Sequence, residues 1–488
     1  MVNKKKSAVK LHHENEGSLT LFNIDDYLVN APAAGNRNGT SLNNDGNNGN
    51  YWSSTPNDNN NDNNAYNLNF NNGNENVNWN NNRNNGLTVR PISELTSESS
   101  ENKVRHFSIS KEQLLLDLYR AYKDARKHKR GKQYQLQFEY NLEENLIKLR
   151  DELINGKYKP LPSECFIIHD PKMREVFAAN FRDRIVHHLF YNYTYEIFER
   201  TFIYDSYSCI KNRGTHFGIE RLKHHVRSVS EGYSKPCYVL KIDIKGYFMN
   251  INRNILLRLC RKTLSKHKNQ FDTSFVDYLL ETIINSNPME NCKVLGRLDD
   301  WNGLPKDKSL FYAKEDCGLP IGNLSSQLFS NIYMNVFDQY VKRNLKCRHY
   351  GRYVDDAFIV SDDRKYLKNL IPEISIYLQN NLGLKIHPYK TRIFDAYQGV
   401  EFLGAFIKPF RTYISSSTLR RIKKKLIDCK IQDKKHLQSS INSFLGVFSH
   451  YDCYCLRRVL FGKNERLSRV GKFDREWLRF MYKVSFCH

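Results

Sequence analysis

The sequence lacks the features of a membrane or secreted protein. None of its 488 residues lies in an apolar run of about 18 residues, the length that a membrane-spanning helix needs. Lys4-Lys5-Lys6, near the start, is followed by a mixed polar segment and not by the apolar core of a signal peptide. We therefore expect a cytoplasmic protein with no membrane partner.

Paired cysteine motifs are also missing. The 11 Cys are scattered, and no two of them form a CxxC, which fits reduced thiols in the cytosol. His450, Cys453 and Cys455 lie close together, but their spacing does not match a known zinc site. Packed thiols in a helix are the favoured interpretation there.

Acidic residues are scarce relative to basic ones. The chain has 75 Lys and Arg against 52 Asp and Glu, a formal net charge of +23. A basic surface of this size suits a polyanion, because contacts with phosphates release counterions. The hydrophobic share of 40% is enough for folded cores, and the length allows two to four domains.

The N-terminal part is dominated by asparagine. After a basic segment at 1–33, 25 of the 50 residues from 36 to 85 are Asn. Such a composition buries little apolar surface, so we expect residues 34–104 to be mostly disordered. Yet Tyr66, Leu68 and Phe70 alternate as a strand would.

From about residue 104 the pattern changes to dense charge with apolar periodicity. Helical spacing predicts helices at 113–130, 141–155, 181–198 and 325–345, and 416–488 is basic and helical. Short β-rich runs occur at 239–244, 352–361 and 399–415. Helices mixed with a few short strands predict an α+β core with a helical C-terminal module.

Two adjacent acids interrupt one of these strands. Asp355 and Asp356 lie between Tyr353-Val354 and the apolar run 357–360. Burying two carboxylates there is costly unless a cation neutralises them. Alone, such a pair is most often a turn, but a β-hairpin that holds Mg²⁺ at its tip would relieve the cost.

A third acid ends an earlier strand-like run. Asp243 follows the run 239–242 and precedes Asp355 by 112 residues. Nucleotide addition uses two metal ions about 3.5–4 Å apart, held by carboxylates from separate strands. The three acids together are therefore a candidate polymerase site.

Two further segments fit a nucleotide pocket. Phe248 would lie under the sugar of a nucleotide and clash with a 2′-hydroxyl, although core packing is the simpler reading of one Phe. The loop 318–327 is a Gly/Pro turn that leads into a helix, and we expect Ser325 to cap that helix. Its glycines would let the backbone approach a base pair closely.

These segments occur in the order of a reverse transcriptase palm, and the chain resembles that family over about residues 105–465. The matching motifs are Pro171–Glu175, Phe181–His188, Asp243 with Phe248, Gly318–Gln327, Tyr353–Asp356, Gly383–Thr391 and Val400–Gly404. The loop reads IGNLSSQ and not the QGxxxSP of intron-type and retroviral enzymes. With FRDRIVHH, it resembles the reverse transcriptases of diversity-generating retroelements.

The resemblance implies a role for each matching residue. Asp243 and Asp355 would be metal ligands, Asp356 a supporting acid, and Ile244 a source of a backbone carbonyl. Lys390 would protonate the leaving pyrophosphate. The implied nucleotide-binding residues are Lys172, Arg174, Arg182, Phe248, Ile321, Gly322 and Gln327, and the implied primer grip is Phe402, Leu403 and Gly404. Taken singly, Lys172, Arg182 and Lys390 read equally well as a solvated basic face.

The resemblance also offers a meaning for the Asn block. Such retroelements copy a template RNA with errors at adenines, and the cDNA replaces a repeat that encodes the end of a C-type-lectin-like protein. Asn codons begin with two adenines and end in a pyrimidine, so mutating those adenines creates no stop codon. The frame Tyr51–Thr55, Trp79, Gly86 and Val89–Pro91 resembles such a repeat. An unrelated Asn-rich leader and a displayed ligand-binding piece are the alternatives.

The implied architecture is a right-hand polymerase: fingers at 105–235, palm at 236–415 and a helical thumb at 416–488. We expect it to extend a DNA or RNA primer on RNA with dNTPs and two Mg²⁺ ions, for which Mn²⁺ could substitute. We expect no RNase H domain and no endonuclease His/Cys cluster. A small basic helical accessory protein is a possible partner, and the setting would be a bacterial or phage-infected cell. The alternatives are a retron-like or phage-defence reverse transcriptase and a non-catalytic RNA-binding protein.

Overall fold

The computed structural model describes residues 107–483, apart from 128, 130, 171, 291 and 429–433, together with the backbone of six strands between residues 36 and 87. The chain divides into two units, Met1–Lys103 and Val104–His488. Among the described residues, no helix combines the length and the apolar character needed to cross a membrane.

The first unit contains two small antiparallel sheets. One has the order β2-β1-β6, from β1 (Asn36–Asn38), β2 (Ser41–Asn43) and β6 (Gly86–Leu87); the other is the meander β3 (Asn48–Pro56), β4 (Asn64–Asn71) and β5 (Asn74–Asn82). The alternation at 66–70 falls within β4, and Asn72-Gly73 between β4 and β5 is a sequence that favours two-residue hairpins. We expected this segment to be mostly disordered, whereas the described residues include these six strands. The disorder expected for the rest of 34–104 lies outside the described residues.

The second unit begins with four helices that pack on one another and with a small sheet. The helices are α2 (Lys111–Arg126), α3 (Gln133–Tyr140), α4 (Leu142–Ile154) and α5 (Phe181–Glu199); the sheet has the order β10-β7-β8, from β7 (Glu164–Ile168), β8 (Arg174–Ala178) and β10 (Lys293–Val294). Helices α2, α4 and α5 were predicted to within a few residues. Their buried residues recur at helical spacing, as Leu114, Leu118, Ala121 and Tyr122 do in α2.

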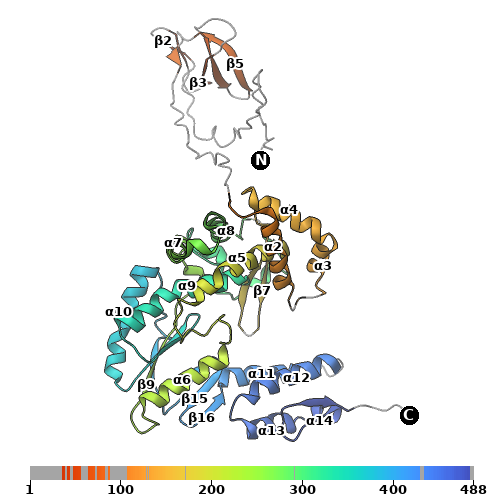
Figure 1. Ribbon diagram of the computed structural model, residues 1–488, viewed down its shortest axis with the longest axis vertical. Helices are drawn as coiled ribbons and strands as arrows, with labels where there is room; N and C mark the ends of the chain where they lie inside the picture. The colour runs from red at the N-terminus through yellow and green to blue at the C-terminus, as the bar shows by residue number, and fades with distance from the viewer. Residues whose placement is uncertain are drawn as a thin grey trace, which may run out of the picture. The chain divides into compact units, whose positions relative to one another are not determined.

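A four-stranded antiparallel sheet forms the centre of the unit. Its order is β11-β12-β9-β13, from β9 (Tyr238–Ile242), β11 (Tyr350–Tyr353), β12 (Asp356–Ser361) and β13 (Arg392–Asp395). α6 (Thr215–Val229) and α10 (Arg364–Leu382) pack against this sheet. α9 (Leu324–Gln339), which runs into a π-helical turn (Tyr340–Asn344), packs on α5 and α10, and α7 (Arg253–Leu264) and α8 (Thr273–Asn285) pack on α5 and on each other (Figure 1).

Both faces of this sheet are buried, in different cores. Ala357 and Ile359 of β12 pack into the large core that includes α9 and α10. Phe358 and Val360, which point the other way, pack into a second core with residues of α6. Strand periodicity therefore assigns alternate residues to alternate faces.

The C-terminal part starts with a small sheet and continues into helices. Strands β14 (Val400–Phe402), β15 (Ala405–Lys408) and β16 (Arg411–Ile414) are followed by α11 (Ser416–Asp428), α12 (Lys434–Ser449), α13 (Tyr454–Gly462), α14 (Glu465–Val470) and the pair β17 (Gly471–Phe473) and β18 (Phe480–Tyr482) (Figure 1). These helices share a core of their own. The strands β17 and β18 fall in a region that we expected to be helical; Phe473 and Phe480 pair across them and stack on that core.

Candidate active site

Strand pairing brings the three predicted acids together. β9 and β12 are antiparallel neighbours whose last pair is Ala357 with Ile242. One residue further along, the same register places Asp356 level with Asp243. Asp355 lies in the turn between β11 and β12. Two acids from one hairpin and one from the neighbouring strand thus meet at one end of the sheet.

The turn that carries Asp355 is strained. Val354 has a φ of 56°, in the left-handed region. That conformation is rare for a β-branched residue, and such a residue persists only where its surroundings hold it. The Val354 carbonyl accepts a hydrogen bond of 2.8 Å from Arg352 Nη1.

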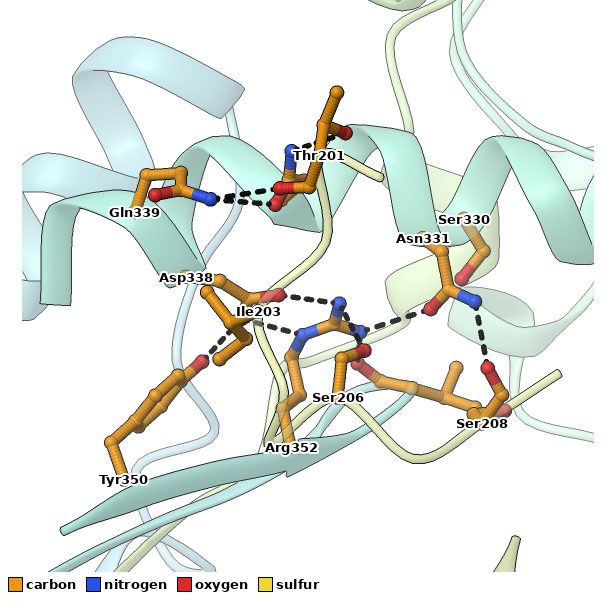
Figure 2. A network of polar contacts seen from close by, with 12 residues as sticks. Thr201, Ile203, Ser206, Ser208, Ser330, Asn331, Asp338, Gln339, Tyr350 and Arg352 are labelled. Carbon is orange, nitrogen blue, oxygen red and sulfur yellow. Dashed lines mark hydrogen bonds and ion pairs between the residues drawn. The ribbon is translucent and has the colours of Figure 1, made fainter. Parts of the chain in front are cut away.

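Arg352 belongs to a buried polar network behind the turn (Figure 2). Its guanidinium forms a two-pronged ion pair with Asp338 of α9, at 2.8 Å from Nε to Oδ1 and 2.7 Å from Nη2 to Oδ2. Neither side chain is exposed to solvent. Tyr350 donates a 2.6 Å hydrogen bond to the same carboxylate. The network is matched in charge and in hydrogen bonds.

The acids at the front of the sheet are not matched in this way. Burial, with Asp243 and Asp356 nearby, raises the pKa of Asp355 to about 6. Burial also raises the pKa of Asp356, and Lys241, at 3.5 Å, opposes that rise. Desolvation disfavours a charged carboxylate unless a positive charge is supplied. The site therefore favours a cation.

A lysine provides part of that charge. Lys390 Nζ lies 3.2 Å from Asp243 Oδ1. The segment around it is fixed beside β9, because His387 N donates to the Asp243 carbonyl and Lys245 N to the Lys385 carbonyl. Among the described residues no group of three His, Cys, Asp or Glu side chains is arranged as a finished metal site. Carboxylate oxygens are the ligands that a divalent cation prefers, so the three acids fit such an ion chemically.

The loop 318–327, called the nucleotide loop below, is hydrogen-bonded to β8 and the residue that follows it. Phe177 N donates to the Ile321 carbonyl at 2.9 Å, and Ala179 N donates to Asn323 Oδ1 at 3.1 Å. Gly322 has a φ of 127°, and a Cβ there would meet Val176 Cγ1 at 2.8 Å. The close contact explains why glycine is needed at this position.

The expected cap of α9 was wrong. The N-cap position is Asn323, and Ser325 lies inside the first turn, where its hydroxyl is 2.7 Å from Nδ1 of the half-buried His187. Burial lowers the pKa of His187 to about 4. A neutral imidazole therefore holds Ser325, and a long-range contact replaced the local cap.

Phe248 lies beside the loop 318–327. Its carbonyl accepts a hydrogen bond from Leu319 N at 2.9 Å. Phe248 and Ile321 pack against the same small cluster of Cys165, Phe177, Met249 and Leu310. Gln327 is exposed on the first turn of α9.

The predicted finger cations separate into two groups. Lys172 and Arg174 are exposed at the start of β8, and the charge of Lys172 opposes the rise that burial causes in the pKa of Asp356. Arg182, in contrast, forms an ion pair with Glu152 and lies over the ring of Tyr158 at 5.0 Å. The structure does not bring Arg182 to the acids; it joins α5 to α4.

The predicted primer grip is the turn between β14 and β15. Leu403 and Gly404 have φ values of 50° and 86°, as a tight hairpin turn requires. Phe402 is buried and packs edge-on against Phe358 at 5.2 Å. Lys241 donates to the Glu401 carbonyl at 2.9 Å, so the cation beside Asp356 also holds this hairpin.

Three residues that lie beside or behind the acids were not singled out from the sequence. Lys241 and Arg352 are cations within strand-forming runs, and Asp338 is an acid on the apolar face of a helix. A charge at a position that periodicity assigns to the core is itself a signal that a partner exists. Ile244, predicted to offer its carbonyl, has a buried side chain and pairs with Ile386 in an isolated bridge.

Two family models match the chain. Residues 169–407 match the model described as "Reverse transcriptase (RNA-dependent DNA polymerase)". Residues 23–92 match a model described as a domain of unknown function. Every site residue predicted from the sequence lies within the first match.

Individual relatives are distant. Protein YkfC of Escherichia coli (strain K12) is 27% identical over 290 residues, which cover 52% of this chain and 69% of YkfC. The group II intron-encoded protein LtrA of Lactococcus lactis subsp. cremoris is 21% identical over 375 residues, 62% of this chain and 56% of LtrA. Among solved structures, apo telomerase from Candida Tropicalis aligns with a TM-score of 0.40 and 14% identity, over 64% of this chain and 58% of that one.

Proposed function

The chain carries a reverse transcriptase domain, the domain of an RNA-directed DNA polymerase, and from this premise we propose that Asp243, Asp355 and Asp356 are its catalytic acids. The observation that carries the proposal is the register of β9 and β12, which brings acids 112 residues apart to one end of one sheet. The pKa of Asp355, raised to about 6, supports it, because the site needs a cation.

The acids would hold two Mg²⁺ ions, with the Ile244 carbonyl as a further ligand. When bound, such ions activate the primer 3′-hydroxyl and stabilise charge on the departing pyrophosphate. Lys390 would donate a proton to the pyrophosphate, a general-acid role for which its place beside Asp243 is suitable. Lys172 and Arg174 would bind the triphosphate from the finger hairpin.

The pocket for the incoming nucleotide would lie between β8, the nucleotide loop and Phe248. Phe248 would exclude a 2′-hydroxyl, while Gly322 would let the loop approach the base pair. Gln327 lies at the solvent-facing end of this loop. Phe402, Leu403 and Gly404 would place the primer terminus. A nucleotide role for Arg182 would require it to leave Glu152.

Primer extension tests the activity. Purified protein, an RNA template with a DNA primer, dNTPs and Mg²⁺ should give full-length cDNA, and Asp355→Ala should reduce the rate by about a thousandfold or more. Asp277→Ala, which removes an exposed acid on α8, is the matched control and should extend at the wild-type rate. Equal extension by wild type and Asp355→Ala would contradict the assignment. No extension at all by the wild type would favour a non-catalytic RNA-binding protein.

We propose further that the cDNA is error-prone and serves to diversify a target gene. The IGNLSSQ loop and the Asn-rich segment support this reading over a retron-like or phage-defence enzyme. The family match over 23–92 adds support, since a recurring segment is not an arbitrary leader. Sequencing cDNA made on the cognate RNA tests it: errors concentrated at adenines are expected, and uniform fidelity would favour the alternatives.

Ile321 offers a second test of fidelity. An apolar side chain in place of the Gln of many relatives loses a hydrogen bond near the base pair, so selection should be looser. Ile321→Gln should lower misincorporation several-fold, since one hydrogen bond is worth about 0.5–1.5 kcal/mol. Misincorporation is measured by single-nucleotide insertion with each dNTP, and unchanged error frequencies would count against this role. Ile393→Gln, at a partly buried apolar position of β13, controls for a general effect of adding an amide.

We propose two further partners: the template RNA, and a small basic helical protein that binds RNA. A pull-down from the native host with and without RNase separates a protein contact from an RNA bridge.

A further inference from the structure

Arg352 uses its hydrogen-bonding groups on four different partners. Besides the two bonds to Asp338, Nη2 contacts Ser206 Oγ at 3.2 Å and Nη1 contacts Asn331 Oδ1 at 3.5 Å. The remaining bond, from Nη1, goes to the carbonyl of Val354. Figure 2 shows the guanidinium between α9 and the segment that contains Ser206. The group cannot rotate without breaking several of these contacts.

The bond to Val354 holds the strained residue of the catalytic turn. Val354 immediately precedes Asp355 and has a φ of 56°. If Val354 relaxed to a negative φ, the direction of the chain into Asp355 would change. A β-branched side chain favours that relaxation, so something must oppose it. Among the described residues, Arg352 is the side chain that bonds the Val354 carbonyl.

Arg352 and Asp338 together form what we call the clamp, and Asp338 connects it to the helix that follows the nucleotide loop. Asp338 and Asn331 belong to α9, which begins at the nucleotide loop. Asn331 is held in turn, because its Nδ2 donates to the Ser208 carbonyl at 2.7 Å. The backbone of Arg352 is tied to the same segment, since its N–H donates to the Asp205 carbonyl and its carbonyl accepts from Tyr207 N. The helix of the nucleotide loop and the turn of the acids are therefore joined through one guanidinium.

We propose that Arg352, clamped by Asp338, is a positioning residue that keeps Val354 in its left-handed conformation and thereby sets Asp355 and Asp356 against Asp243. The inference rests on the proposed polymerase function of these acids. It predicts that losing the clamp impairs metal binding and the chemical step more than the binding of template, primer or dNTP.

A purely structural role for the ion pair makes a different prediction. Replacing a buried pair by apolar residues of similar volume is often neutral for stability, whereas removing one partner is strongly destabilising. The double variant Arg352→Met/Asp338→Leu is therefore suitable for separating the two roles. It removes both charges together and leaves the Val354 carbonyl without its donor; adding Tyr350→Phe to it removes the buried hydroxyl that would otherwise lose its acceptor on Asp338. A single Arg352→Met variant would leave Asp338 buried and unpaired.

The first measurement is of metal binding without catalysis. Mn²⁺ can be titrated into wild type and the double variant and followed by electron paramagnetic resonance. We expect the double variant to bind Mn²⁺ at least about tenfold more weakly while its unfolding temperature stays within a few degrees of the wild type. Replacing the exposed two-pronged pair Arg261–Asp277 by the same residues, Met and Leu, is the matched control and should leave Mn²⁺ affinity unchanged. Equal Mn²⁺ affinity in the Arg352→Met/Asp338→Leu variant would overturn the proposal.

The second measurement is a rescue at Val354. Glycine adopts a φ of 56° without steric cost, whereas alanine does not. In the Arg352→Met/Asp338→Leu background, Val354→Gly should restore Mn²⁺ affinity and kcat at least about threefold, and Val354→Ala should not. KM for dNTP should change less than twofold throughout. Equal effects of Gly and Ala would show that the conformation of Val354 is not what Arg352 controls.

The two proposals fail in different ways. If the wild type binds Mn²⁺ but extends no primer, the polymerase assignment fails and the Mn²⁺ titration still tests the clamp. If the wild type extends primers and the double variant does so at the same rate, the clamp is overturned and the polymerase assignment stands.

Discussion

Buried charges are neutralised by a partner on one face of the β11–β12 hairpin, but only partly neutralised on the other. On one face, Arg352 and Asp338 are fully buried, and each satisfies the other. On the other face and at the tip, Asp243 has Lys390 at 3.2 Å and Asp356 has Lys241 at 3.5 Å, yet the pKa values of Asp355 and Asp356 are both raised. The Arg352–Asp338 ion pair stabilises the hairpin, and the excess negative charge of the acids at its end favours the binding of cations. The contrast separates the part that supports the site from the part that binds a ligand.

The largest effect should come from removing an acid that has no substitute. Asp243→Ala should lower the primer-extension rate by about a thousandfold or more, about 4 kcal/mol in the activation barrier. Because the substitution removes negative charge from a crowded site, the thermal unfolding temperature should not fall. Loss of activity together with a large loss of stability would mean that Asp243 is a structural acid and would break the contrast.

The opposite result is expected behind the sheet. Asp338→Asn leaves the guanidinium of Arg352 buried without a counter-charge, which should lower the free energy of unfolding by about 3–5 kcal/mol. Urea unfolding followed by circular dichroism measures it. Asp277→Asn, in the exposed pair with Arg261, is the control and should cost about 1 kcal/mol or less. Similar losses in the two variants would show that burial does not matter to the Arg352 pair.

A smaller effect is expected where the nucleotide loop meets β8. Gly322→Ala places a Cβ 2.8 Å from Val176 at a φ of 127°, so the loop must shift. Backbone strain of this kind costs about 1–3 kcal/mol, and we expect it mainly as a rise in KM for dNTP. Gly446→Ala in α12, where an added Cβ meets nothing within 4 Å, is the matched control. A change in kcat alone would place the loop outside nucleotide binding.

The smallest effect has the least intuitive sign. The pKa of Asp355 is raised from its ordinary value to about 6, so its charged form destabilises the fold without metal. The penalty is small near pH 4, grows as pH rises through 6 and is complete above about pH 7. The whole shift corresponds to about 3 kcal/mol. Because Asp355 is only partly buried and solvent screens its charge, we expect Asp355→Asn to raise the free energy of unfolding by about 1–2 kcal/mol at pH 7.5 and by little at pH 4. Thermal unfolding of both proteins in EDTA at the two pH values measures this.

Added Mg²⁺ gives the complementary result. It should raise the unfolding temperature of the wild type at pH 7.5 and have little effect on Asp355→Asn, since a ligand that binds only the folded state stabilises it. An equal rise in both proteins would indicate metal binding elsewhere.

Sequence patterns predicted much of this arrangement, but only where the signal is local. The apolar runs around Asp243 and Asp356 predicted strands, and helical spacing predicted α2, α4 and α5. The family resemblance and not periodicity predicted that these strands are neighbours. Pairing between β9 and β12 depends on contacts more than a hundred residues apart, which a local pattern does not contain.

The residues that were missed, or whose contacts were not foreseen, are those whose partners lie far away in the sequence. Arg182 resembles a nucleotide contact by motif, but Glu152 and Tyr158 engage it. Ser325 has the chemistry of a cap, but His187 of α5 binds it instead. Arg352 had no assigned role because Asp338, its counter-charge, lies in a different element. In each case tertiary packing determines which partner the side chain contacts, and the local sequence does not.

The pairing of β9 with β12 also bears on which insertions the chain between these strands can accept. Hydrogen bonds between two strands, and not the length of chain between them, set the spacing of the acids. The connecting segment includes the short helix η2 (Ser265–Gln270), which has no buried residue. Doubling the length of a flexible loop costs only about 0.6 kcal/mol. Insertions at η2 should therefore be tolerated in evolution, and the same position is suitable for a peptide tag or fluorescent label in a protein that remains active.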